Sequence, residues 1–218
     1  MEIYQSEQEQ VEALRKWWRE NGVAVIGGIA LGLGLAFAVW AWRDYHKNQA
    51  VQASAEYEQL LGDVRRGAAQ EALERSGRIM SKYSGTPYAV FAALANAKLA
   101  LDQSDNGAAR KHLEWALSHA SEPAIKQLAR LRLARVMLDQ DAAEEALKLI
   151  HNAEVGGFRA DYDVVLGDIH FDLNHVDQAR SAYQKALGAL PAGSEQVTLI
   201  QMKLDDLGMA SSLAPAQP

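Results

Sequence analysis

The stretch VAVIGGIALGLGLAFAVWAW, residues 23–42, contains no charged residue and no Asn or Gln. Nine of its twenty residues are Leu, Ile, Val or Phe. At about 1.5 Å of rise per residue, a helix of this length covers about 30 Å, the hydrocarbon thickness of a bilayer. Aromatic residues flank the stretch on both sides, as is typical at the two membrane interfaces: Trp17, Trp18, Trp40, Trp42 and Tyr45. The sequence therefore predicts a single N-terminal transmembrane helix over residues 23–42.

Two alternatives for this stretch are a buried core helix and a cleaved signal peptide. A core helix of this length normally carries polar residues and lacks tryptophan at both ends. Ala36-Phe37-Ala38 has the small-x-small pattern of a cleavage site, but it lies inside the apolar run rather than after it. Residues 1–22 also hold five acidic groups, whereas a signal peptide begins with a short basic region. We therefore expect the helix to remain as an anchor.

The distribution of positive charge predicts the orientation. Arg15, Lys16 and Arg19 precede the apolar stretch, and Arg43 and Lys47 follow it. Because positive charge near the ends of a span prefers the cytoplasmic side, we expect residues 1–22 to form a short cytoplasmic leader. The rest of the chain is then expected on the opposite side of the membrane.

Composition limits the partners of this outer part. The chain has 218 residues, a net charge of −6 and no cysteine. The leader holds three basic and five acidic residues, and the part after the apolar stretch holds nineteen basic and twenty-three acidic residues. A mildly acidic domain argues against nucleic acid as a ligand. The outer part is long enough for one domain with its own hydrophobic core.

Small residues line one side of the predicted transmembrane helix. Gly28 and Gly32 form a G-x-x-x-G pattern, and Gly34 lies close to them. Small residues at this spacing let two helices approach closely. The pattern therefore points to a contact with a partner helix or with a second copy of this chain, as in a homo-oligomer.

After the apolar stretch, hydrophobic residues recur every three to four positions and no strand pattern appears. An amphipathic helix is expected from about residue 44 to Arg66-Gly67, and a second from Ala68 to about Tyr83. Thr86 and Pro87 are then expected to open a third helix, with the threonine side chain as its cap. The sequence predicts an all-α domain.

The chain also contains an internal repeat. Its clearest copy places small residues where two antiparallel helices would touch, an aromatic residue in the second helix and a proline after it: Leu166, Gly167, Ala179, Tyr183, Ala186 and Pro191. This pattern resembles the tetratricopeptide repeat, except that Asp163 stands where the repeat has an early tryptophan. The likeness implies an α-solenoid of helix pairs.

Weaker copies precede this one. Leu133, Ala134 and Ala146 occupy the corresponding positions thirty-three residues upstream, and Ala97 and Ala109 belong to a third copy. Asp141 followed by Glu144 resembles a capping box at the start of a second helix. The helices expected over residues 44–64 and 68–83 would form a fourth copy. A C-terminal helix lined by Leu199 or Ile200, Leu204 and Leu207 is expected to cap the array, and residues 208–218 are expected to be disordered.

Together with the single predicted span, three segments resemble the YfgM family, the ancillary subunits of the bacterial SecYEG translocon. They are WWRENG at 17–22, LRLARV at 131–136 and QMKLDDL at 201–207, and the likeness runs from Met1 to about Leu207. The resemblance implies a single-pass inner-membrane protein with a cytoplasmic N-terminus and a periplasmic helical domain, residues 43–207. It also implies association with the SecYEG translocon and transfer of emerging chains to periplasmic chaperones.

No catalytic or metal-binding pattern stands out in the sequence. The six histidines include no H-E-x-x-H pair, and no cysteine completes a zinc site. The acidic groups lie at expected helix starts and turns, where capping explains them. We therefore expect neither an enzyme nor a cofactor.

The repeat register predicts a groove. In arrays that resemble tetratricopeptide repeats, the first helix of each pair lines a concave face. Carrying that register onto this chain gives a candidate partner groove of eleven residues: Phe91, Leu94, Lys98, Leu101, Leu128, Leu131, Arg135, Leu138, Val164, Asp168 and Phe171. An apolar surface of this kind usually binds a partner. The alternative is that the helix at 44–64 or the C-terminal helix already fills the groove.

Two function classes follow. The first is a membrane-anchored interaction subunit of the Sec protein translocon. The second is a self-associating envelope scaffold that is unrelated to secretion and uses the G-x-x-x-G pattern.

Overall fold

The computed structural model of this chain describes residues 2–151, 153–191 and 193–213. Within these ranges the chain forms nine α-helices, one short 3-10 helix and no β-strand. The expected all-α fold is therefore confirmed. The chain divides into two compact units, Met1–Val51 and Gln52–Pro218.

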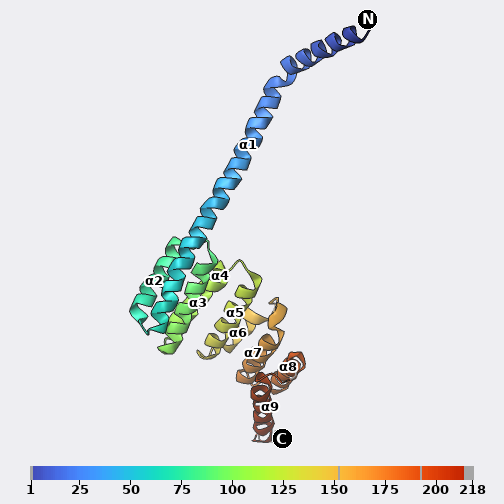
Figure 1. Cartoon of the computed structure of the whole chain (residues 1–218). Coiled ribbons are helices and arrows are strands. Elements are labelled where there is room, and N and C mark those ends of the chain that lie inside the picture. Colours follow the sequence, from blue (N-terminus) through green and yellow to red (C-terminus); the bar gives the residue numbers. More distant parts are fainter. Residues whose placement is uncertain (1, 152, 192, 214–218) are drawn as a thin grey trace. The chain divides into compact units, whose positions relative to one another are not determined.

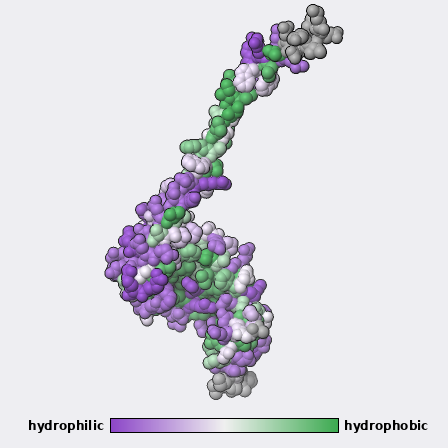
Figure 2. Space-filling view, viewed as in Figure 1, coloured by the Kyte–Doolittle hydropathy of each residue, from purple (hydrophilic) through white to green (hydrophobic). Residues whose placement is uncertain are grey.

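The first unit consists of the N-terminal part of α1 (Glu2–Arg65), the helix that contains the apolar stretch. Among the described residues, α1 is the helix long and apolar enough to cross a membrane. Its apolar side chains project outward rather than into a core, and Leu33 is 67% exposed. Figure 2 shows this hydrophobic surface along the helix. Such exposure argues against a buried core helix, because apolar side chains of this size are normally buried in a folded protein.

The second unit is a stack of antiparallel helix pairs (Figure 1). Each helix packs mainly against the next one along the chain, as in a solenoid. After the last part of α1 come α2 (Ala69–Lys82), α3 (Pro87–Asp102), α4 (Asn106–His119), α5 (Pro123–Leu138), α6 (Ala143–Ile150), the 3-10 helix η1 (Gly156–Phe158), α7 (Arg159–Asp172), α8 (Val176–Ala189) and α9 (Gln196–Leu213).

The same turn joins the two helices of each pair. Gly67, Ser104, Asp141 and Asn174 all have φ between 58° and 71°. In each turn the following N–H donates to the carbonyl five residues back, at 2.8–3.0 Å, which closes the first helix in a Schellman motif. The turn at Gly67 shows that the end of α1 and α2 form a helix pair ahead of the three pairs whose helices are joined at Ser104, Asp141 and Asn174.

Two helix-capping predictions differ from the structure. The backbone of Thr86 is extended, as a cap requires, but its hydroxyl donates to the carbonyl of Tyr83 at 2.8 Å instead of capping α3. The predicted capping box at Asp141 and Glu144 is wrong, because Ala142 is the residue that precedes α6. Asp141 is held at positive φ by the preceding turn, so its side chain makes no cap bond to this helix.

The small residues of the repeat lie where helices approach closely. A Cβ atom at Gly167 in α7 would overlap the ring of Tyr183 in α8, so only glycine fits there without movement. The equivalent Ala134 in α5 is fully buried, as are Ala146, Ala179 and Ala186, while Leu133 and Tyr183 are nearly so. Leu166 is partly exposed, and Pro191 lies on the surface just beyond α8.

Two polar contacts tie the first helices together. Asp63 in α1 is 2% exposed and accepts hydrogen bonds from Arg75 Nε in α2 at 2.6 Å and from Arg66. Ser76 in α2 donates to Asn96 Oδ1 in α3 at 2.6 Å, inside the core. Hydrogen bonding to Arg75 holds the pKa of the Asp63 carboxyl below its usual range. Hydrophobic periodicity does not reveal such buried pairs.

The last helix, α9, caps the array. Ile200 and Leu207 are almost fully buried against α8, whereas Leu199 is 53% exposed. Of the tail expected at 208–218, residues 208–213 continue α9 as a helix. Residues 214–218 lie outside the described residues.

Candidate functional site

The structure separates the candidate groove into buried and exposed residues. Leu94 and Leu131 belong to the hydrophobic core, with 7% and 2% exposure. Five members are partly exposed: Phe91, Leu128, Leu138, Val164 and Asp168. The four exposed members are Lys98, Leu101, Arg135 and Phe171. These eleven residues therefore form no continuous apolar groove; their exposed part combines two cations with two apolar side chains.

Helices of the same chain cover the two ends of this set. Tyr57 in α1 contacts Phe91 in α3, with ring centroids 5.9 Å apart. At the other end, Lys203 in α9 donates to Asp168 in α7 at 2.6 Å. Helices α1 and α9 of the same chain therefore cover the two ends of the predicted groove. In the middle of the set, Leu101 and Arg135 remain exposed. Figure 2 shows hydrophobic residues in the middle of the visible face of this unit, bordered by hydrophilic ones.

A polar cluster lies at the C-terminal end of the set. Asp168 accepts from the Tyr183 hydroxyl at 2.7 Å and from Lys203, and the ammonium group of Lys203 lies 5.8 Å from the centre of the Tyr183 ring. Burial, together with the hydrogen bond to Asp168, raises the pKa of Tyr183 well above its usual value. Burial also raises the pKa of Asp172, and the nearby Asp168 carboxylate adds to the shift. Phe171 stands beside this cluster with 46% of its surface exposed.

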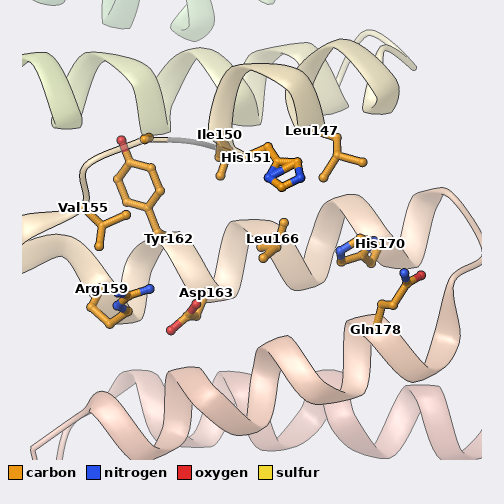
Figure 3. Close-up of a pocket in the computed structure, with 11 residues that line it drawn as sticks. Leu147, Ile150, His151, Val155, Arg159, Tyr162, Asp163, Leu166, His170 and Gln178 are labelled. Carbon is orange, nitrogen blue, oxygen red and sulfur yellow. The ribbon is translucent and has the colours of Figure 1, made fainter.

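A larger pocket lies between α6, α7 and α8, outside the candidate groove (Figure 3). Its volume is about 400 Å³. Figure 3 shows Arg159 and Asp163 toward one end and His170 and Gln178 toward the other, with Leu166 between them. The remaining side chains come from α6, the following loop and α7: Leu147, Ile150, His151, Ala153, Val155 and Tyr162.

The titratable groups of this pocket are partly desolvated. Asp163 is 7% exposed, and burial raises its pKa. Burial lowers the pKa of His170, and the neighbouring His175 adds to the effect. Within the described residues, the buried Nδ1 atom of His170 has no hydrogen-bond partner. The sequence signal for this pocket was the aspartate at the tryptophan position of the repeat.

The part of the chain that the structure describes holds no group of three or more His, Cys, Asp or Glu side chains arranged for a metal ion. On α4, His119 stacks on Trp115 at a centroid distance of 3.9 Å.

Comparison with known proteins relates both units to a single group. A sequence profile described as tetratricopeptide repeat-like domain matches residues 15–209. Relatives from Haemophilus influenzae, Escherichia coli and Neisseria gonorrhoeae are each named ancillary SecYEG translocon subunit. They are 29%, 28% and 26% identical to this chain, over 92%, 96% and 95% of it and over 97%, 100% and 100% of their own lengths. The resemblance inferred from the sequence is confirmed.

Proposed function

This chain belongs to the tetratricopeptide repeat-like domain family, and from that membership we propose that it is a membrane-anchored ancillary subunit of the SecYEG translocon. The observation that carries the proposal is the length of the match to proteins of that name, which includes the apolar helix as well as the repeats. A protein that shared only the repeat fold would match over the second unit alone.

The apolar part of α1 is proposed as a single-pass anchor in the bacterial inner membrane. Ten large aliphatic or aromatic side chains of residues 23–42 are at least half exposed, and lipid would cover them: Val23, Ile26, Ile29, Leu31, Leu33, Leu35, Phe37, Val39, Trp40 and Trp42. Three Lys and Arg residues precede the apolar stretch and two closely follow it, which supports a cytoplasmic leader, residues 1–22, and a periplasmic domain from residue 43.

The helical domain is proposed to work by binding proteins rather than by catalysis. Its exposed residues on α3, α5 and α7 would bind the translocon or a chain emerging from it, and periplasmic chaperones would receive that chain. Lys98 and Arg135 pair within the chain with Asp102 and Asp161, and Leu101 and Phe171 supply apolar surface. This combination suits a partially unfolded polypeptide with apolar residues.

Native sizing after gentle detergent extraction tests the association. We expect the chain to co-migrate with the translocon pore, and a homomer alone would refute the proposal. A photo-crosslinking residue at Leu101 or Phe171 should then yield an adduct with the translocon or an emerging chain. The same residue at Lys111, which is exposed on α4, is the matched control and should give none.

The second function, a self-associating envelope scaffold, rests on the glycines of the anchor. A Cβ atom at Gly28, Gly32 or Gly34 would meet no atom within 4 Å, so this side of the helix has room for a close neighbour. Replacing Gly28 and Gly32 by leucine would then dissolve a homo-oligomer. If co-migration with the translocon persists in that variant, self-association is not required for the first function.

A further inference from the structure

The pocket between α6, α7 and α8 exists because two features of the repeat are missing. The second helix of the other pairs has 14 residues, whereas α6 has 8 and ends at Ile150. In addition, Asp163 occupies the position where the repeat pattern has tryptophan. A short helix and a small side chain together leave the volume of about 400 Å³ unfilled. This volume lies within the range typical of ligand-binding pockets.

The 3-10 helix η1 and the start of α7 lie against α5. Gly156 has a φ of 46°, and a Cβ atom there would lie 3.1 Å from the side chain of Gln127. Tyr162 donates to the backbone carbonyl of Gln127 at 3.4 Å. Gln127 is itself 8% exposed, so it holds the loop from within the core. The rim of the pocket is therefore built into the fold.

The chemistry of the pocket favours a cation. Leu147, Ile150 and Leu166 provide apolar surface, and Asp163 provides a carboxylate with 7% exposure. Arg159 and Lys185 act on Asp163 electrostatically, but within the described residues no cation lies within the 4 Å of an ion pair with it. A buried carboxylate is costly unless it is paired. A neutral apolar group would leave the carboxylate unpaired.

We propose that this pocket receives the side chain of an arginine or lysine from another polypeptide. The aliphatic stem of such a side chain would lie against the leucine and isoleucine side chains, and its charged head would pair with Asp163. His151 and Gln178 are exposed at the pocket and offer hydrogen-bonding groups to a peptide backbone. A small free amine has no peptide backbone and would therefore make no such hydrogen bonds to His151 and Gln178.

This site is separate from the candidate groove and goes beyond the proposed function. The inference shares with that function only the premise that the domain binds polypeptides. Co-migration with the translocon is measured on the same variants, so loss of one property without the other distinguishes the two proposals.

Histidine imidazole resonances provide a local readout in the full-length protein in detergent micelles. The chain has six histidines. His151 and His170 line the pocket, and His175 lies next to His170, whereas His112 and His119 on α4 serve as internal controls. The probe is the capped peptide Ala-Ala-Arg-Ala-Ala, and the comparison peptide carries citrulline, a neutral analogue of arginine. We expect the arginine peptide to shift the two pocket histidines and to bind at least about tenfold more tightly than the citrulline peptide.

Three variants locate the effect. Asp163→Asn keeps the volume and removes the charge, so it should abolish the preference for arginine over citrulline. Asp163→Trp restores the residue of the repeat pattern and fills the pocket, so both peptides should lose binding while the domain stays folded. Asp177→Asn, at a side chain that is 97% exposed on α8, is the matched control and should behave like the wild type.

The inference is overturned if both peptides bind the wild type equally or if Asp163→Asn keeps the preference. It is also overturned if agmatine, a free alkyl guanidine, binds as tightly as the arginine peptide, because the pocket would then bind a small cation rather than a side chain of a polypeptide. Unchanged His112 and His119 resonances show that the helical domain of each variant is folded.

Discussion

Replacing Gly167 by alanine tests the close contact between α7 and α8. The added Cβ would overlap the ring of Tyr183, which is 2% exposed and fixed by its hydrogen bond to Asp168. Forcing an extra methyl group into a packed interface costs about 1–3 kcal/mol. Because the ring has little freedom to move, the upper end of this range applies. Replacing glycine by alanine within a helix also stabilises the helix by about 0.5–1 kcal/mol, which offsets part of this cost.

The net destabilisation is therefore about 2 kcal/mol. For a domain of this size it should lower Tm by about 4–8 °C. Thermal unfolding of the full chain, followed by circular dichroism in detergent, measures this shift. Hydrogen exchange of peptides from α7 and α8 shows that the loss is local.

Two further variants make the reasoning refutable. A Cβ atom at Gly77, in the middle of α2, would meet no atom within 4 Å, so Gly77→Ala should stabilise by about 0.5–1 kcal/mol. In a Tyr183→Leu background the overlap with the ring disappears, and Gly167→Ala should become neutral or stabilising. If Gly167→Ala costs the same in both backgrounds, the contact with Tyr183 is not the cause.

Three other outcomes are expected. Leu33→Arg places a charge near the bilayer centre at about 3 kcal/mol on insertion scales, so less protein should resist alkaline carbonate extraction. Asp63 has a lowered pKa, so its ion pair stabilises the fold above the unfolded pKa of this carboxyl and is lost as the pH falls through the folded value. Arg75→Met should therefore reduce stability at neutral pH more than under strongly acidic conditions, as measured by urea unfolding. A single cysteine at Phe171 should react readily with a maleimide, whereas one at the core residue Leu131 should react only after unfolding.

Hydrophobic spacing predicts the elements of this chain well. The helix pairs, the apolar helix and the closing helix all follow from residues at three- and four-residue intervals. The contact of Gly167 with Tyr183 follows from the repeat pattern because that pattern records which positions touch. The turn residues are harder to read, since Ser104 and Asp141 occupy a backbone conformation in which glycine is the usual residue.

The candidate groove is harder to predict than the helices that carry it. Spacing places Leu131 and Arg135 on the same side of α5, yet the first is 2% exposed and the second is open to solvent. Which of them faces a neighbouring helix depends on how far each pair is rotated against the next. One sequence carries no information about that rotation. The early end of α6 escapes prediction for a similar reason, because Ala153 and Val155 continue the apolar spacing beyond it.

The shortness of α6 also has a mechanical consequence. A stack of layers bends where adjacent layers share the least surface, and the third and fourth helix pairs meet across an eight-residue helix and an unfilled volume. Strain applied to the domain would concentrate at this seam. The hydrogen bond from the Tyr162 hydroxyl to the Gln127 carbonyl links the two helix pairs across this seam. A ligand bound in this pocket would therefore change the angle at which α7, α8 and α9 continue the stack.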